Sequence, residues 1–322
     1  MQRRALLLAG ASTPWMTSWA LAQDGAYPSK PIRLIVPYPA GGVVDIVART
    51  VAERMAIGLK QPIVVEARPG ANANIGAEAV ARSPADGYTL LMVSPFLATN
   101  PLLAQGVRWK AADFTGIGLI GAPPNLFIVP ASLPVRSLKE LVEYARARPG
   151  KLNVSNPGIG SSNHLGQELF FSLTGVDMVD VSYKGQPPML ADFFSGQLSF
   201  GLITQALAMP HVKEGRLRAL AIGAPQRSPD LPDVPTVAQA GFPDASFLPW
   251  YGMAAPAGTP RDIVRRLSDE LQKALASPDV VSRLEKMGTQ ITPGSAEELD
   301  ALIQREITRW SRVIKERNIK AD

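Results

Sequence analysis

Short apolar runs alternate with helically spaced apolar positions along the first third of the chain. Residues 32–36 predict a buried strand, and the apolar residues within 44–55 then recur at the spacing of one helix face. Two further apolar runs, 63–65 and 89–93, predict strands on either side of a short helix at 77–82. This alternation of strand and helix predicts an α/β fold with a parallel sheet.

The same alternation starts again near Asn125 and predicts a second α/β unit. Its predicted strands are the apolar runs at residues 126–129, 152–154, 179–181, 198–203 and 217–222. Ser137 and Glu140 form a capping box, which opens a helix that runs to about Arg146. A proline-rich polar stretch follows Ala224. The remaining helical patterns lie at residues 260–276, 279–287 and 295–318.

Two glycine-rich turns, residues 37–45 and 155–164, lie where a predicted strand gives way to a predicted helix. A helix start offers unpaired backbone N–H groups and the positive end of the helix dipole, so each turn is a candidate anion clamp. The candidate donors are the N–H groups near Gly41, Gly42 and Gly160 and the hydroxyls of Ser161 and Ser162. Two such turns suggest a cleft. The alternative is that both turns only satisfy the starts of their own helices.

Composition narrows the possible functions. A chain of 322 residues exceeds the usual size of one domain, so we expect two. The formal net charge of +5 suits anionic ligands, and no long basic run indicates a nucleic-acid partner. The absence of cysteine excludes disulfide bonds and thiol chemistry.

Residues 1–22 have the pattern of an export signal peptide. A basic start at Arg3 and Arg4 precedes a short apolar run, and a small-residue cleavage pattern ends at Ala22. We therefore expect cleavage near that residue and export to the periplasm. Pro14 interrupts the apolar run, which argues against a membrane anchor. The pattern does not distinguish Sec from twin-arginine export.

No pattern favours a catalytic residue, a metal centre or a cofactor. The two histidines, His164 and His211, lie outside any zinc-binding motif. Ser162 lies close to His164, as in the active site of a hydrolase, but no Gly-x-Ser-x-Gly motif surrounds it. Capping of the following helix is the simpler role for this hydroxyl. Residues 158–163 lack the last glycine of a dinucleotide-binding motif, and no Walker lysine is present.

Many short segments match one family in order and spacing. They are residues 27–37, 40–42, 45, 66–70, 74–77, 84–91, 160–165, 168–170, 183–185, 210–211, 217–220, 232–237 and 255–260. Through them the whole chain after the signal resembles the Bug family, the extracytoplasmic solute receptors of tripartite tricarboxylate transporters.

This resemblance implies a type II periplasmic binding protein, with two α/β lobes and a ligand cleft between them. Residues 23–124 and 248–322 would form lobe 1, and residues 125–247 would form lobe 2. The implied ligand is a small carboxylic acid held by the loops after the first strand of each lobe. The contacts carried over are Tyr38, Ala40, Gly41, Gly42 and Asp45 on one side and Gly160, Ser161, Ser162 and Tyr183 on the other.

Two departures from the family pattern bear on the kind of acid. Val43 and Val44 are apolar where members usually carry a small hydroxyl residue before the aspartate, and Leu202 and Ile203 replace a Phe-Asp pair. Ile203 cannot pair with a ligand amine. We therefore add Val44, Ile203 and Thr204 to the predicted site. We expect an acid without an amino group and with an apolar or aromatic body.

A ligand that contacts both lobes would shift the population towards a closed form. The resemblance implies that permease subunits in the membrane recognise this form. We expect a monomer that needs no metal, cofactor or nucleic acid and performs no catalytic step. The alternative function is a periplasmic carboxylate sensor or scaffold that signals to a partner protein through the same closed form.

Overall fold

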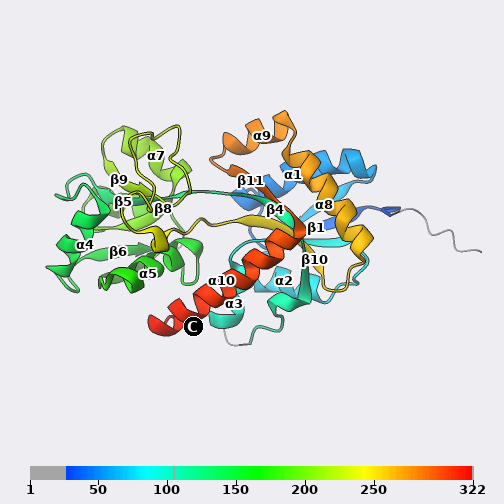
Figure 1. Cartoon of the computed structure of the whole chain (residues 1–322), viewed down its shortest axis with the longest axis horizontal. Helices are drawn as coiled ribbons and strands as arrows, with labels where there is room; N and C mark the ends of the chain where they lie inside the picture. The colour runs from blue at the N-terminus through cyan, green and yellow to red at the C-terminus, as the bar shows by residue number, and fades with distance from the viewer. Residues whose placement is uncertain (1–26, 104–105, 184, 321–322) are drawn as a thin grey trace, which may run out of the picture.

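The computed structural model describes residues 27–103, 106–183 and 185–320, which form two α/β lobes lying side by side (Figure 1). The predicted export signal, residues 1–22, lies outside this part of the chain. Within the described ranges, no helix combines the length and the apolar character needed to span a membrane.

Lobe 1 contains a six-stranded sheet with the order β11-β4-β10-β3-β1-β2. The parallel part of this sheet consists of three predicted strands, since β1 (Ile32–Val36) pairs in parallel with both β2 (Ile63–Ala67) and β3 (Thr89–Val93). Alternate residues of these strands pack against α1 (Val43–Leu59) on one face and α2 (Asn74–Ala81) on the other. Coverage of both faces explains why the strands are almost continuously apolar.

The antiparallel part of this sheet was not predicted as strands. It consists of β4 (Phe114–Ala122), β10 (Tyr251–Pro256) and β11 (Gln290–Gly294), with β10 inserted between β3 and β4. A Cβ atom at Gly116 would lie 2.8 Å from the first carbonyl oxygen of α10 (Ala296–Glu316). Glycine in β4 therefore allows the C-terminal helix to approach the sheet closely.

Three more helices complete lobe 1. They are α3 (Phe96–Leu103), α8 (Arg261–Leu275) and α9 (Pro278–Glu285), with a short 3-10 helix at Ala111–Asp113. The two C-terminal ones correspond to predicted helices, whereas α3 was not predicted. Its sequence is apolar on all sides and contains Pro101, so it lacks the one-sided pattern of a surface helix.

Lobe 2 is built from the central part of the chain. Its strands are β5 (Asn125–Pro130), β6 (Asn153–Asn156), β7 (Val179–Ser182), β8 (Gly201–Thr204) and β9 (Leu217–Ile222). Its helices are α4 (Leu138–Arg146), α5 (Ser162–Thr174), α6 (Met189–Phe194) and α7 (Gln205–Lys213), with a 3-10 helix at Pro243–Ala245. β6 and β7 pair in parallel, and a parallel bridge between Val154 and Phe200 links them to the sheet β8-β5-β9.

The two lobes are joined by chain crossings and by the C-terminal helix. The chain crosses between β4 and β5 and again between β9 and β10, and α10 extends from lobe 1 towards α5 of lobe 2 (Figure 1). There the ring of Trp310, which is fully buried, meets Phe247 at 4.9 Å between centroids, and Arg317 Nε lies 2.7 Å from Glu168 Oε2. We propose that the lobe boundaries fall at residues 124/125 and 247/248, close to the two crossings.

Candidate functional site

The predicted clamps lie at corresponding edges of the two lobes. The loops that leave the carboxyl ends of β1, β2 and β3 lie at one edge of lobe 1, because these strands are parallel. The loops after β6 and β7 share an edge of lobe 2 for the same reason. In α/β proteins such edges form binding crevices. We call residues 37–45 clamp 1 and residues 158–164 clamp 2.

Clamp 1 presents an open helix start. The helix α1 begins at Val43 after Gly42, and no side chain caps it. Its first backbone N–H groups therefore have no acceptor inside the helix. Ala40, Gly41 and Gly42 are exposed, and Gly41 has φ +79°, a value that favours glycine. A Cβ atom at Gly41 would meet no described atom within 4 Å, so the turn is open to an incoming anion.

The buried carboxylate of Asp45 holds the backbone of clamp 1 in its conformation. Its carboxylate is 2% exposed, and Oδ2 accepts hydrogen bonds from the Gly41 N–H and from Arg49 Nε, both at 2.9 Å. The hydrogen bond from Arg49 lowers the pKa of Asp45, so the group stays ionised at neutral pH. Arg49 balances this charge locally, which reduces repulsion of an anion bound in the turn. Asp45 Oδ1 is buried without a partner among the described residues.

Tyr38 and the two valines form the apolar side of clamp 1. The hydroxyl of Tyr38 hydrogen-bonds Ser94 Oγ at 2.8 Å, and its ring meets Phe96 edge-on at 6.2 Å between centroids. Burial raises the pKa of Tyr38, which keeps the phenol neutral. Val44 packs against the core of lobe 1, whereas Val43 is 42% exposed beside the open helix start. A ligand held here would touch apolar surface next to its anionic group.

Clamp 2 has a capped helix start. Ser161 is the N-cap of α5, and its Oγ accepts a hydrogen bond from the His164 N–H at 3.3 Å. Gly160 has φ +76° and donates its N–H to His164 Nδ1 at 3.2 Å. The hydroxyl hydrogen of Ser161 and the free N–H groups of the first helical turn remain available to an anion. Ser161 and Ser162 are both half-buried.

His164 supports clamp 2 as a neutral ring. It is 5% exposed, and Nε2 lies 3.9 Å from Asp180 Oδ2. Burial lowers the pKa of His164 and outweighs the opposing effect of Glu168 and Asp180. A neutral imidazole can accept the Gly160 N–H on Nδ1 only if Nε2 carries the proton. The ring is therefore committed to holding the turn, and no hydrogen bond joins it to the Ser162 hydroxyl in the described part of the chain.

The other predicted residues of lobe 2 are tied to groups of their own lobe. The hydroxyl of Tyr183 donates to Asp192 Oδ2 at 2.5 Å, and the Ile203 side chain is fully buried in the lobe 2 core. Thr204 Oγ1 accepts a hydrogen bond from Gln186 Nε2 at 2.9 Å. These three residues stay predicted ligand contacts. The contact with Gln186 had no signal in the sequence.

Clamp 2 lies next to residues of lobe 1 that were not among the predicted site residues. A Cβ atom at Gly160 would lie 2.8 Å from Leu103 Cδ1 and 3.7 Å from Asn72 Nδ2. The same region borders clamp 1, because a Cβ atom at Gly76 would lie 2.8 Å from Pro37 Cβ. The sequence could have indicated Asn72 as a site residue, because it lies in the loop that follows a predicted parallel strand.

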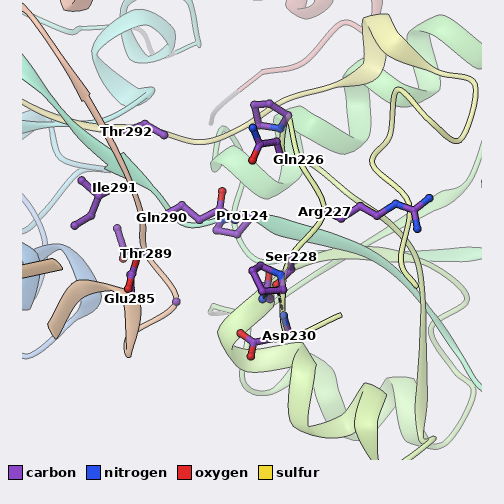
Figure 2. A pocket seen from close by; sticks show the side chains of 14 residues that line it. Pro124, Gln226, Arg227, Ser228, Asp230, Glu285, Thr289, Gln290, Ile291 and Thr292 are labelled. Atoms are coloured by element: carbon purple, nitrogen blue, oxygen red, sulfur yellow. Dashed lines mark hydrogen bonds between the residues drawn. The ribbon is translucent and has the colours of Figure 1, made fainter. Parts of the chain in front are cut away.

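A cavity of about 570 Å³ lies elsewhere between the lobes, beside the crossing at Pro124 (Figure 2). Its remaining lining residues are Gln205, 225–230, Glu285 and 288–292, so both lobes contribute walls and neither clamp does. Figure 2 shows Arg227 pointing away from it, and that guanidinium bonds Gln239 and Pro232 instead. Among the described residues that line the cavity, Arg227 is the one cation, and its guanidinium is already engaged. The clamps therefore remain the predicted anion site.

No metal centre accompanies the clamps. Among the residues that the structure describes, no group of three or more His, Cys, Asp or Glu side chains is placed to hold a metal ion.

Known proteins share both the sequence and the architecture. A family model described as "Tripartite tricarboxylate transporter family receptor" matches residues 47–319. The chain is 36% identical over 322 residues to a UPF0065 protein in the tcbD-tcbE intergenic region of Pseudomonas sp. (strain P51), covering 99% of this chain and 96% of that protein. It is 35% identical over 297 residues to protein BugT of Bordetella pertussis (strain Tohama I), covering 91% of each.

Among solved structures, the chain is similar to R. palustris Rpa4515 with adipate. The two are 36% identical, with a TM-score of 0.76, and the match covers 91% of this chain and 99% of that chain. This likeness confirms the predicted fold of a type II periplasmic binding protein with two α/β lobes.

The pH dependence of the free energy of unfolding should show that His164 is neutral in the folded protein. Because its pKa is lowered in the folded protein, the unfolded chain binds a proton that the folded chain does not as the pH falls below about 6.5. The free energy of unfolding should therefore decrease over this range. In a His164→Asn variant, whose amide oxygen can still accept the Gly160 N–H, this part of the decrease should disappear.

Urea denaturation at a series of pH values from about 7.5 to about 5 measures the effect. The wild-type protein, measured at the same pH values, is the reference. An unchanged slope in the His164 variant would show that the pKa of this ring does not change on folding.

Proposed function

Because the chain belongs to the tripartite tricarboxylate transporter receptor family, we propose that it captures a small carboxylic acid between its lobes and delivers it to a membrane permease. The family consists of periplasmic solute receptors rather than enzymes. A binding role requires no catalytic group, which agrees with the commitment of His164 to clamp 2.

The observation that carries the proposal is the pair of helix starts. Clamp 1 offers the uncapped first turn of α1, and clamp 2 offers the first turn of α5 with the Ser161 hydroxyl. They belong to different lobes: clamp 2 lies beside Asn72 and Leu103 of lobe 1, and clamp 1 lies beside Gly76 of the same lobe. Hydrogen bonds to an anion contribute about 1.5 to 3 kcal/mol each, so a few of them supply micromolar affinity.

We propose an acid without an amino group and with an apolar or aromatic body. An ammonium group would need an accessible carboxylate, but Asp45 is buried and paired with Arg49. Ile203, whose side chain is fully buried, places no carboxylate at its position, and Val43 adds exposed apolar area at clamp 1. Adipate, which accompanies the similar Rpa4515 structure, is an acid of this kind.

Delivery depends on closure of the lobes. A ligand bound to one lobe alone shifts no equilibrium, whereas a ligand that contacts both clamps favours the closed form by its differential affinity. We propose that the permease recognises this form. We further propose that the receptor acts as a monomer in the periplasm after cleavage of its signal peptide near Ala22.

Calorimetry with a panel of acids tests the ligand class. We expect adipate or an aromatic acid such as terephthalate to bind, and glutamate and aspartate to give no heat. A Ser161→Ala variant should bind the same acid about tenfold more weakly, because it loses a hydroxyl donor in clamp 2.

Ser137→Ala is the matched control. Ser137 caps α4 in the same way, with its Oγ accepting a hydrogen bond from the Glu140 N–H at 3.1 Å, but it lies outside both clamps. Loss of either cap should lower the free energy of unfolding by about 1 kcal/mol. Only the Ser161 variant should lose affinity. Tight binding of glutamate, or equal affinity losses in both variants, would contradict the proposal.

Lobe closure can be tested at Gly288, where the lobes touch. Gly288 has φ +73°, and a Cβ atom there would lie 2.9 Å from the Cβ of Ala206 in lobe 2. Gly288→Ala should therefore hold the lobes apart and weaken acid binding. In X-ray scattering with saturating acid, its radius of gyration should stay larger than that of the wild-type protein.

Gly215→Ala provides the control for backbone strain. Gly215 has φ +70°, and a Cβ atom there would meet no described atom within 4 Å. This variant should lose a similar amount of stability, because alanine is unfavourable in the left-handed region, but it adds no contact between the lobes. It should close like the wild-type protein. If the Gly288 variant closes equally well, contact at this point does not limit closure.

A further inference from the structure

Two buried oxygens in residues beside the cavity between the lobes have no hydrogen-bond partner among the described residues. One is Oε1 of Gln205 in lobe 2, and the other is Oγ1 of Thr289 in lobe 1. Their residues are 6% and 1% exposed, and both line the cavity of Figure 2. Buried polar atoms in folded proteins are almost always paired, so two unpaired ones at one boundary between lobes require an explanation.

The two residues flank a direct contact between the lobes. Each is next in sequence to one member of the pair Ala206 and Gly288, where a Cβ atom on the glycine would lie 2.9 Å from the Cβ of Ala206. Gln205 is the first residue of α7, and Thr289 lies in the turn between α9 and β11. In the present arrangement of the lobes, no hydrogen bond joins these two side chains.

The side chain of Gln205 is fixed to lobe 2 by one end of its amide. The backbone N–H of this residue bonds the Pro124 carbonyl at 2.8 Å, beside the first chain crossing, and Nε2 donates to Ser228 Oγ at 2.6 Å. The other end of the amide, Oε1, is an acceptor with two lone pairs and receives no donor. Gln205 therefore has a fixed position and lacks one partner.

Thr289 is fixed to lobe 1 and has the chemistry of the missing partner. Its backbone N–H bonds the Leu284 carbonyl at 3.0 Å, which ties it to the end of α9. A threonine hydroxyl carries one hydrogen and two lone pairs, so it can supply the donor that Gln205 lacks. It suits the amide in either orientation, because it can also accept a hydrogen bond.

We infer that Thr289 and Gln205 form a latch, a hydrogen bond between the lobes that is made when the bound acid draws the lobes together. This inference rests on the proposed function. Because the two residues belong to different lobes, a change in the angle between the lobes changes the distance between Oγ1 and Oε1. Formation of the bond gives a partner to both oxygens at once, so the latch stabilises the closed form.

The latch makes acid affinity depend on side chains outside both clamps. A ligand closes the protein by its differential affinity for the closed form. A hydrogen bond that exists only in that form adds to the same balance and raises the apparent affinity. Removal of the Thr289 hydroxyl should therefore weaken acid binding and leave the fold of the ligand-free protein intact.

The test removes this hydroxyl and keeps the shape of the side chain. Calorimetry compares the wild-type protein with Thr289→Val and Thr289→Ser, with adipate and terephthalate as probes. Thr289→Val should bind the acid about fivefold more weakly, the effect of one ordinary hydrogen bond, and its thermal midpoint without acid should not fall. Thr289→Ser keeps the hydroxyl and should bind the acid as the wild-type protein does.

Thr50→Val is the matched control. Thr50 lies within α1, is 3% exposed and also has a buried Oγ1 without a partner among the described residues. Its substitution should leave acid affinity unchanged, because it lies inside lobe 1. A double-mutant cycle with Gln205→Met identifies the partner of Thr289. In that background, Thr289→Val should cause no further loss of affinity.

Three outcomes would overturn the latch and leave the proposed function standing. Equal acid affinity in Thr289→Val and the wild-type protein would show that the hydroxyl gains no partner on binding. A loss accompanied by a lower thermal midpoint without acid would show that the hydroxyl supports the fold. An undiminished loss in the Gln205→Met background would show that Thr289 has another partner. Failure of the wild-type protein to bind any carboxylic acid would instead refute the proposed function, and the latch with it.

Discussion

An α-helix starts with backbone N–H groups that have no acceptor within the helix, and this protein places one such start after a strand at an edge of each lobe. The rest of the site keeps these groups accessible. Asp45 with Arg49 braces the turn before α1, and the neutral ring of His164 braces the turn before α5. Each brace satisfies a glycine N–H outside the helix, and we propose that the anionic group of the ligand takes the remaining N–H groups of the first helical turn.

The joint between the lobes limits how these helix starts can move. The helix α10 belongs to the sheet of lobe 1, yet its last turns pack against α5, which carries clamp 2. Trp310 and Phe247 form the apolar part of this joint, and Arg317 with Glu168 forms the polar part. A movement of lobe 2 relative to α10 would therefore involve α5, the helix whose first turn we propose as part of the ligand site.

Strands and helices with one-sided or continuous apolar patterns were predictable, and elements shaped by tertiary contact were not. The runs that became β1 and β3 and the helix start at Ser137 could be read directly, because local pattern determines them. β4 contains glycines because α10 and β11 pack so closely against it that a Cβ atom would clash. In the sequence, a stretch with several glycines is typical of a loop, so β4 was not predicted. The two glycine turns were readable from their glycines, and their role in anion binding stays a prediction. The hydrogen bond between Asn72 and Asn100 left no signal in the local pattern, because the two residues lie 28 positions apart.

The position of β10 in the sheet has a consequence for the order in which the chain can fold. β10 lies between β3 and β4, so the sheet of lobe 1 remains divided until residues 251–256 are available. The strands of lobe 2 all lie within residues 125–222 and need nothing from the C-terminus. In a chain that emerges from its N-terminal end, the central lobe can assemble first, while β4 of the outer lobe stays separate from the parallel group β1, β2 and β3. The receptor thus gains its complete ligand site only after nearly the whole chain has emerged.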